Sequence, residues 1–214
     1  MRAKRVRVLL VDDHAVVRAG YRLLLQNAPE IEVVAEADSG ELGCRLFAEL
    51  APDVVIMDLT LPGIGGLEAI RRIVQRSRQA KVLVFSMHED TLFVEQALAA
   101  GARGYVTKSS APQVLVAAVK QIAAGGRPLA GDIAERLSFA RVRGHDSPLA
   151  SLSTREFEIF CLLAEGLSSA EIAKRLSLSH NTVANYGTQL KSKLGVGTVA
   201  ELARLAIRHG VIAA

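Results

Sequence analysis

Cysteine is scarce in this chain of 214 residues, which holds only Cys44 and Cys161. Neither has the CxxC or Cys/His spacing of a metal site, and each lies within an apolar helical pattern. The scarcity favours two reduced core thiols in a cytoplasmic protein over a metal site built on thiolates.

Long apolar runs are lacking as well. Half of the chain is apolar, so a core can form, but no run approaches the roughly 20 residues that a transmembrane helix needs. The basic start Met1–Arg5 leads directly into a strand pattern, without the apolar segment and cleavage site of a signal peptide. We expect neither a membrane span nor a signal peptide.

A strong excess of charge is the third absence. Residues 1–124 carry 15 basic and 14 acidic side chains, residues 125–150 carry 4 and 3, and residues 151–214 carry 7 and 5. Charge alone therefore does not establish a nucleic-acid partner. The distribution is more informative, because the segment 174–193 contains cations and no acid: Lys174, Arg175, Lys191 and Lys193.

Short apolar strands alternate with longer amphipathic stretches in the first half of the chain. The strand patterns are Val6–Val11, Ile31–Ala37, Asp53–Met57, Lys81–Ser86 and Gly104–Thr107. The helical patterns lie near 14–27, 40–50, 66–78, 90–100 and 112–124. Five such units predict a five-stranded parallel sheet with helices on both faces, a doubly wound, flavodoxin-like α/β fold.

The second half has no strand signal, and a linker separates it from the first. Four helices are predicted near 154–165, 169–176, 180–193 and 198–209. Between the halves, Gly125-Gly126-Arg127-Pro128 breaks the helical pattern, and the sequence allows a short helix at 131–139. We predict an α/β domain over 1–124, a linker over 125–150 and a small all-α, four-helix domain over 151–214.

Carboxylates follow two of the predicted strands directly. Asp12 and Asp13 end the first strand, and Asp58 follows the third. Parallel strands bring these ends to one edge of the sheet, where three negative charges repel one another unless a cation joins them. Because oxygen ligands beside a phosphate suit Mg²⁺, we expect magnesium at this edge.

Ser86 and Lys108 end two further strands at the same predicted edge. The set is suited to phosphoryl transfer: Asp58 can act as the carboxylate nucleophile, and Lys108 and Ser86 can contact phosphoryl oxygens. Mg²⁺ would be held by Asp13 and Asp58, with Asp12 acting through water.

These residues, in this order, resemble the receiver domain of bacterial response regulators, as do Leu61-Pro62-Gly63 and Gly104-Tyr105. The resemblance implies that a sensor histidine kinase phosphorylates Asp58, that Ser86 then moves toward the phosphate, and that Tyr105 turns inward. It also implies that Thr60 and His88 tune the phosphate lifetime, and we count the backbone carbonyl of Thr60 among the magnesium ligands. Taken singly, Tyr105 suits a core aromatic residue and His88 a solvated loop residue.

In the second half, Ala170–Leu176 and Asn181–Lys193 have helix-turn-helix spacing. The second helix is expected to direct Ala184, Asn185, Thr188 and Lys191 outward, where Asn can bond adenine and small residues or Thr can meet a thymine methyl. The expected DNA contacts are Thr182, Ala184, Asn185, Tyr186, Thr188, Lys191 and Lys193.

Leu152-Ser153-Thr154-Arg155-Glu156, Glu171-Ile172-Ala173 and Lys193-Leu194-Gly195-Val196 resemble the LuxR-type DNA-binding domain. Together the halves resemble the NarL/FixJ class of response regulators. In that class the last helix, here Val199–His209, pairs two DNA-binding domains, which implies a homodimer on a pseudo-palindromic DNA site. Ala184 and Tyr186 depart from the family pattern.

We therefore predict a DNA-binding transcription regulator, not an enzyme, that is switched by phosphorylation of Asp58. One alternative is a DNA-binding regulator that acts independently of phosphorylation. A remoter alternative is an aspartyl-phosphate phosphatase, but such enzymes need a second Asp where Thr60 stands. A nucleotide switch is weaker still, because Gly63-Ile64-Gly65-Gly66 is neither a GxGxxG motif nor a P-loop.

Overall fold

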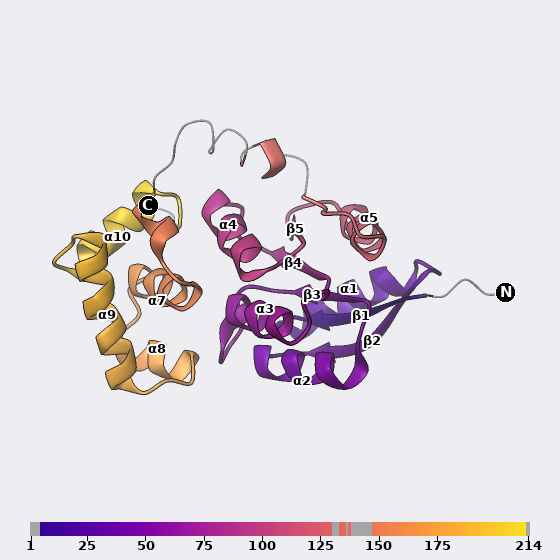
Figure 1. Ribbon diagram of the computed structural model, residues 1–214, viewed down its shortest axis with the longest axis horizontal. Coiled ribbons are helices and arrows are strands. Elements are labelled where there is room, and N and C mark those ends of the chain that lie inside the picture. The colour runs from indigo at the N-terminus through magenta and orange to yellow at the C-terminus, as the bar shows by residue number, and fades with distance from the viewer. Residues whose placement is uncertain (1–4, 130–132, 136, 138–146, 213–214) are drawn as a thin grey trace. The chain divides into compact units, whose positions relative to one another are not determined.

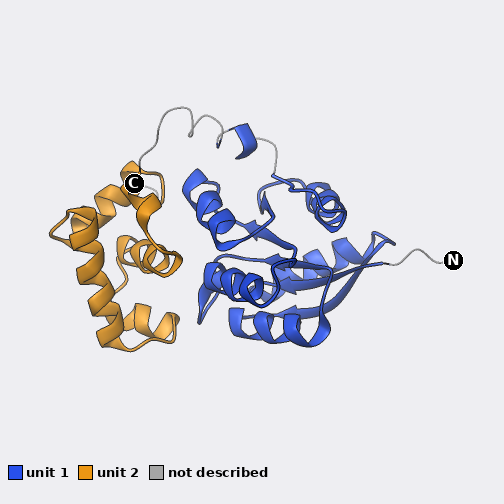
Figure 2. Cartoon of the chain, in the orientation of Figure 1, with its two compact units in different colours: residues 1–139 blue, residues 140–214 orange. Residues whose placement is uncertain are grey.

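The computed structural model describes residues 5–129, 133–135, 137 and 147–212. The chain divides into two compact units, residues 1–139 and 140–214 (Figure 2), and each is described by itself. Among the described residues, no helix is long and apolar enough to cross a membrane.

A five-stranded parallel sheet forms the centre of the first unit (Figure 1). Its strands are β1 (Val6–Val11), β2 (Ile31–Ala37), β3 (Val54–Met57), β4 (Val82–Ser86) and β5 (Gly104–Thr107), in the order β2-β1-β3-β4-β5. The three central strands, β1, β3 and β4, consist almost entirely of apolar residues because helices cover both faces of the sheet. All residues of β3 and β4 are buried, as are those of β1 from Val8 onward. The predicted doubly wound α/β fold is confirmed.

Five helices cover the sheet. They are α1 (Ala15–Gln26), α2 (Gly40–Leu50), α3 (Gly65–Arg76), α4 (Thr91–Ala100) and α5 (Pro112–Ala123). Helices α1 and α5 contact each other on one face, while α3 packs between α2 and α4 on the other. Every loop that follows the carboxyl end of a strand therefore opens on one edge of the sheet, which positions the residues of the site.

The chain beyond α5 continues along the outer edge of β5. The Tyr105 N–H donates to the Pro128 carbonyl at 2.8 Å, and Tyr105 forms a parallel bridge with Leu129. Gly104 permits this approach, because a Cβ there would lie 2.8 Å from both the ring and the carbonyl oxygen of Pro128. The first residues of the predicted linker are therefore ordered against the sheet.

The short helix predicted at 131–139 is only partly within the described residues. Residues 133–135 and 137 are helical, and Ile133 and Leu137 are buried. The other positions of that prediction, and most of the predicted linker after it, lie outside the described residues.

The second unit is entirely helical. A 3-10 turn, η1 (Pro148–Ser151), precedes α7 (Thr154–Ala164), α8 (Ser169–Arg175), α9 (His180–Leu194) and α10 (Val199–Arg208). Capping boxes start α7, α8 and α10 through Ser153, Ser168 and Thr198, each with a Glu three residues later. The four predicted helices are confirmed.

Candidate functional site

Five side chains from four strand ends meet at the carboxyl edge of the sheet and form the acidic pocket: Asp12, Asp13, Asp58, Ser86 and Lys108. The backbone aligns them. The Asp58 N–H donates to the Val11 carbonyl at 2.9 Å, and the Lys108 N–H donates to the Ser86 carbonyl at 2.8 Å. All five residues that the sequence predicted at this edge therefore lie at, or directly after, the carboxyl ends of neighbouring strands.

Lys108 joins the two buried carboxylates of the pocket. Its Nζ lies 2.7 Å from Asp12 Oδ2 and 2.7 Å from Asp58 Oδ2. Asp12 and Asp58 are 2% and 3% exposed, so both charges are removed from water. Burial raises the pKa of Asp58, against the opposing hydrogen bond and charge of Lys108. Burial acts to lower the pKa of Lys108, but its bonds to the two carboxylates outweigh that effect and raise it.

The open side of the acidic pocket carries Asp13 and His14, both exposed. His14 Nδ1 lies 2.8 Å from Asp13 Oδ1, and ligand atoms of these two residues, Asp12 and Asp58 all lie within 4.8 Å of one another. Sequence analysis missed His14, and it missed Arg18, whose Nη1 donates to the Asp12 carbonyl at 2.6 Å. The position of His14 directly after two pocket carboxylates was the signal available in the sequence.

The loop after Asp58 is held against the start of α3 by a close backbone approach. A Cβ on Gly66 would collide with the carbonyl oxygen of Asp58, and the Gly66 N–H donates to the Leu59 carbonyl at 3.1 Å. The Thr60 N–H in turn donates to Asp58 Oδ1 at 3.3 Å. Glycine is thus required at 66 to keep the Asp58 loop in place.

Thr60, Ser86, His88 and Tyr105 form one polar network beside the pocket. His88 Nε2 lies 3.3 Å from Thr60 Oγ1, and the His88 N–H donates to Ser86 Oγ at 3.3 Å. The Tyr105 hydroxyl donates to the His88 carbonyl at 2.8 Å, and the Tyr105 side chain is fully buried. The three residues predicted as switch residues are therefore connected to one another and to Ser86.

The interpretation of His88 as a solvated loop residue is wrong. Its ring stacks on Phe93 of α4, with centroids 3.8 Å apart and planes at 10°. Burial, with a smaller effect of the Lys108 charge, lowers the pKa of His88 to about 4. The imidazole is therefore neutral near pH 7, and its contact with α4 could not be predicted from local sequence.

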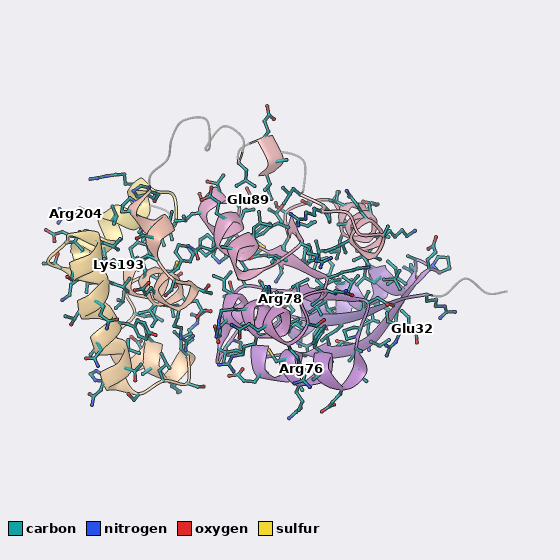
Figure 3. All side chains as sticks on the ribbon, viewed as in Figure 1. Glu32, Arg76, Arg78, Glu89, Lys193 and Arg204 are labelled. Carbon is teal, nitrogen blue, oxygen red and sulfur yellow. The ribbon has the colours of Figure 1, made fainter. Side chains whose placement is uncertain are left out.

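Helices α8 and α9 form the predicted helix-turn-helix, whose buried seam includes Ile172, Val183 and Leu190. Of the expected DNA contacts on α9, Ala184, Asn185, Thr188 and Lys193 are exposed, while Thr182, Tyr186 and Lys191 are half-buried. Lys193 differs from the others because its Nζ is 2.8 Å from Glu156 Oε2 of α7 (Figure 3). The Thr188 hydroxyl also has a partner, the Ala184 carbonyl at 3.2 Å.

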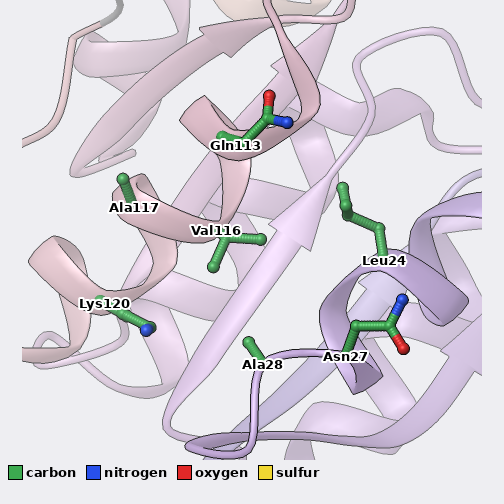
Figure 4. Close-up of a pocket in the computed structure, with 7 residues that line it drawn as sticks. All are labelled: Leu24, Asn27, Ala28, Gln113, Val116, Ala117 and Lys120. Carbon is green, nitrogen blue, oxygen red and sulfur yellow. The ribbon is translucent and has the colours of Figure 1, made fainter.

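A surface groove lies between α1 and α5 (Figure 4). Its volume is about 360 Å³, and it is lined by Leu24, Asn27, Ala28, Gln113, Val116, Ala117 and Lys120. None of the residues of the acidic pocket or of the predicted DNA contacts lines it. The groove is therefore separate from the residues predicted to take part in phosphoryl transfer.

Comparison with known families divides the chain at the same two units. The response regulator receiver domain matches residues 8–120, and the luxR family of bacterial regulatory proteins matches residues 150–206. The response regulator UvrY of Escherichia coli (strain K12) is 40% identical over 208 residues, which are 96% of this chain and 95% of that protein. The response regulator GacA of Pseudomonas aeruginosa is 40% identical over 209 residues, 97% and 98% of the two chains.

Solved structures give the same relationship. RcsB from Salmonella enterica serovar Typhimurium, bound to promoter P1flhDC in the presence of the phosphomimetic BeF3−, is 26% identical with a TM-score of 0.71. The match covers 94% of this chain and 98% of RcsB. A LuxR-family two-component response regulator from Aurantimonas sp. SI85-9A1 is 49% identical with a TM-score of 0.63, over 65% of this chain and 99% of that one.

Proposed function

Because the chain belongs to the two-component response regulators that join a receiver domain to a LuxR-type DNA-binding domain, we propose that phosphorylation of Asp58 controls its binding to promoter DNA. The observation that carries the proposal is the environment of Asp58. This carboxylate is 3% exposed, directly follows β3 and lies 2.7 Å from the ammonium group of Lys108. A structural aspartate at the surface would need neither the burial nor the cation.

The residues of the acidic pocket divide the chemistry between them. The Asp58 carboxylate attacks the phosphorus of the donor, which forms the acyl phosphate and releases the donor group. Lys108 balances charge that builds on the phosphoryl oxygens, and Ser86 supplies a hydroxyl to one of them. The phosphate donor is a phosphohistidine of a sensor histidine kinase, so the protein receives the group and is not itself an enzyme with a turnover product.

The donor set of the pocket fits Mg²⁺. The cluster holds three carboxylates, of which Lys108 contacts Asp12 and Asp58, while Asp13 lies against His14. One ammonium group does not balance three carboxylates. A divalent cation held by Asp12, Asp13, Asp58 and the Thr60 carbonyl would supply further positive charge. When bound, it neutralises phosphoryl oxygens during transfer.

The polar network offers a route from the pocket to α4 and β5. Ser86 of the pocket, Thr60 beside Asp58 and Tyr105 of β5 all bond to His88, whose ring stacks on α4. A phosphoryl group that accepts a hydrogen bond from the Ser86 hydroxyl would draw Ser86 Oγ toward it and so change the distance of that oxygen from the His88 N–H. We assign Thr60, His88 and Tyr105 as the switch residues on this basis.

The output half would bind double-stranded DNA through α9 in the major groove. The exposed Ala184, Asn185 and Thr188 support this assignment, as does the RcsB complex with promoter DNA. Lys191 and Lys193 supply the positive charge that phosphates require. A homodimer that pairs through α10 would place two copies of α9 on a pseudo-palindromic site.

Labelling tests the acceptor. Acetyl phosphate with Mg²⁺ should phosphorylate the protein, and Asp58→Asn should abolish the label, while Asp13→Asn should only reduce it, because the nucleophile remains. Label that survives Asp58→Asn would overturn the assignment. Operator affinity of both variants, at one stated salt concentration, then separates a phosphorylation-controlled regulator from a DNA-binding regulator that does not use the phosphate.

A further inference from the structure

The outward face of α9 is a stripe of small and neutral polar side chains. Six exposed residues form this recognition stripe: Asn181, Ala184, Asn185, Thr188, Gln189 and Ser192. Their spacing of three and four residues places them on one side of the helix, and the buried Val183 and Leu190 lie on the other. The stripe is therefore the part of α9 that a DNA groove would meet.

The recognition stripe contains no cation along α9, all of whose residues the structure describes. His180 and Lys191 flank the stripe on the side of Ala184, and Lys191 is half-buried, whereas Lys193 is already paired with Glu156. Arg and Lys are the side chains that bond guanine O6 and N7 in the major groove. The six exposed positions of the stripe therefore lack the common means of selecting guanine.

Carboxamides take the place of cations. Asn181, Asn185 and Gln189 are four residues apart and form a row that spans about 12 Å along the helix. That length corresponds to about three or four base pairs. A carboxamide carries one donor and one acceptor side by side, which matches N6–H and N7 of adenine.

Two further members of the stripe, Ala184 and Thr188, suit thymine. Ala184 offers only a methyl group, and Thr188 uses its hydroxyl on the Ala184 carbonyl at 3.2 Å, which leaves its methyl group for a base. Methyl groups contact the thymine C5-methyl favourably. The polar and the apolar parts of the stripe therefore point to the same base pair.

Resting on the proposed function, we propose that α9 selects A·T base pairs at the centre of each half-site, with Asn185 bonded to adenine N6 and N7. Asn181 and Gln189 contact the neighbouring base pairs, and Lys191 contacts the phosphate backbone. The half-site is thus read without a charged side chain on a base edge.

The experiment selects bound duplexes from a randomised library with the full-length protein, acetyl phosphate and Mg²⁺, at a fixed salt concentration. Affinities are then measured for one selected site and its single-base variants. We expect an A·T core in each half-site, and a loss of about tenfold or more when the adenine read by Asn185 becomes guanine.

Three variants separate base reading from general DNA binding. Asn185→Ala should remove the preference at one base pair of each half-site and leave the others, and Asn185→Arg should shift it to guanine. Both place stronger helix formers on an exposed position, so the fold is retained. The matched control Lys191→Ala, six residues further along α9, should weaken binding to every sequence alike and reduce the slope of log affinity against log salt concentration by about one.

The outcomes are distinguishable. A selected core of G·C pairs, or an equal loss of affinity on all sequences in Asn185→Ala, would overturn the assignment of adenine and leave a DNA-binding regulator in place. A library from which no sequence is enriched would overturn the proposed function, and the assignment with it.

Discussion

Gly187 weakens α9, and replacing it should stabilise the second unit. It lies in the middle of the helix, where glycine costs about 0.5–1 kcal/mol relative to alanine because more backbone freedom is lost on folding. An added Cβ would meet only Leu163 Cδ1, at 3.8 Å, which is an ordinary van der Waals contact. The full gain of about 0.5–1 kcal/mol should therefore be realised in Gly187→Ala.

Scanning calorimetry or thermal circular dichroism of the full chain would measure the effect. For a domain of this size, 1 kcal/mol corresponds to about 4–8 °C in the unfolding midpoint. We expect the transition of the second unit to rise by about 2–8 °C and that of the receiver unit to stay unchanged.

Gly195→Ala is the matched control. Gly195 also has open space around its Cβ position, but its φ of 67° ends α9 in the left-handed region. The same added methyl should therefore destabilise the unit, by about 1 kcal/mol. A midpoint that falls or does not move in Gly187→Ala would refute the reasoning, because it would mean that glycine serves a purpose at 187 other than the one its surroundings indicate.

Three further predictions concern the pocket loop, the polar network and a helix cap. Gly66→Ala should destabilise the receiver unit by about 3 kcal/mol, because the methyl group collides with the Asp58 carbonyl; an unchanged denaturant midpoint would contradict it. His88 has a folded-state pKa of about 4 against 6.5 for the unfolded chain. The contribution of its neutral form to the free energy of unfolding of the receiver unit should therefore be full above pH 6.5 and should be lost as the pH falls to about 4. Chemical denaturation across that range should show the decline, and His88→Phe should flatten it. Ser168→Ala removes the acceptor for the Glu171 N–H at the start of α8 and should cost about 1 kcal/mol in the unfolding of the second unit, whereas Ser168→Asp should restore most of it.

The sheet and the positions of the pocket residues could be predicted because both depend on local pattern. Buried parallel strands are continuous apolar runs, so the predicted β1 and β5 agree with the structure at both ends. A polar residue directly after such a run must lie at the carboxyl edge, so the sequence predicts that Asp58 and Lys108 lie close together, as their 2.7 Å contact confirms.

The features that were missed depend on approaches in three dimensions that no local pattern of apolar and polar residues encodes. The requirement for glycine at 66 comes from a carbonyl eight residues earlier, and the stacking of His88 on Phe93 comes from the direction in which α4 leaves its loop. Lys193 has no acid near it in sequence, yet folding brings it to Glu156. The roles of the pocket residues and of the DNA contacts remain predictions that the proposed experiments test.

The bond from Tyr105 to Pro128 has a consequence for the solubility of the receiver half. β5 ends the sheet, and an uncovered outer strand offers unpaired N–H and C=O groups to any other extended chain. Pro128 and Leu129 cover this edge of the sheet, and a proline there offers no N–H of its own to a further strand. A receiver fragment cut after residue 124, where the helical pattern of the sequence stops, would expose the outer edge of β5 and would tend to self-associate through it. A fragment that ends at residue 139 would keep it closed.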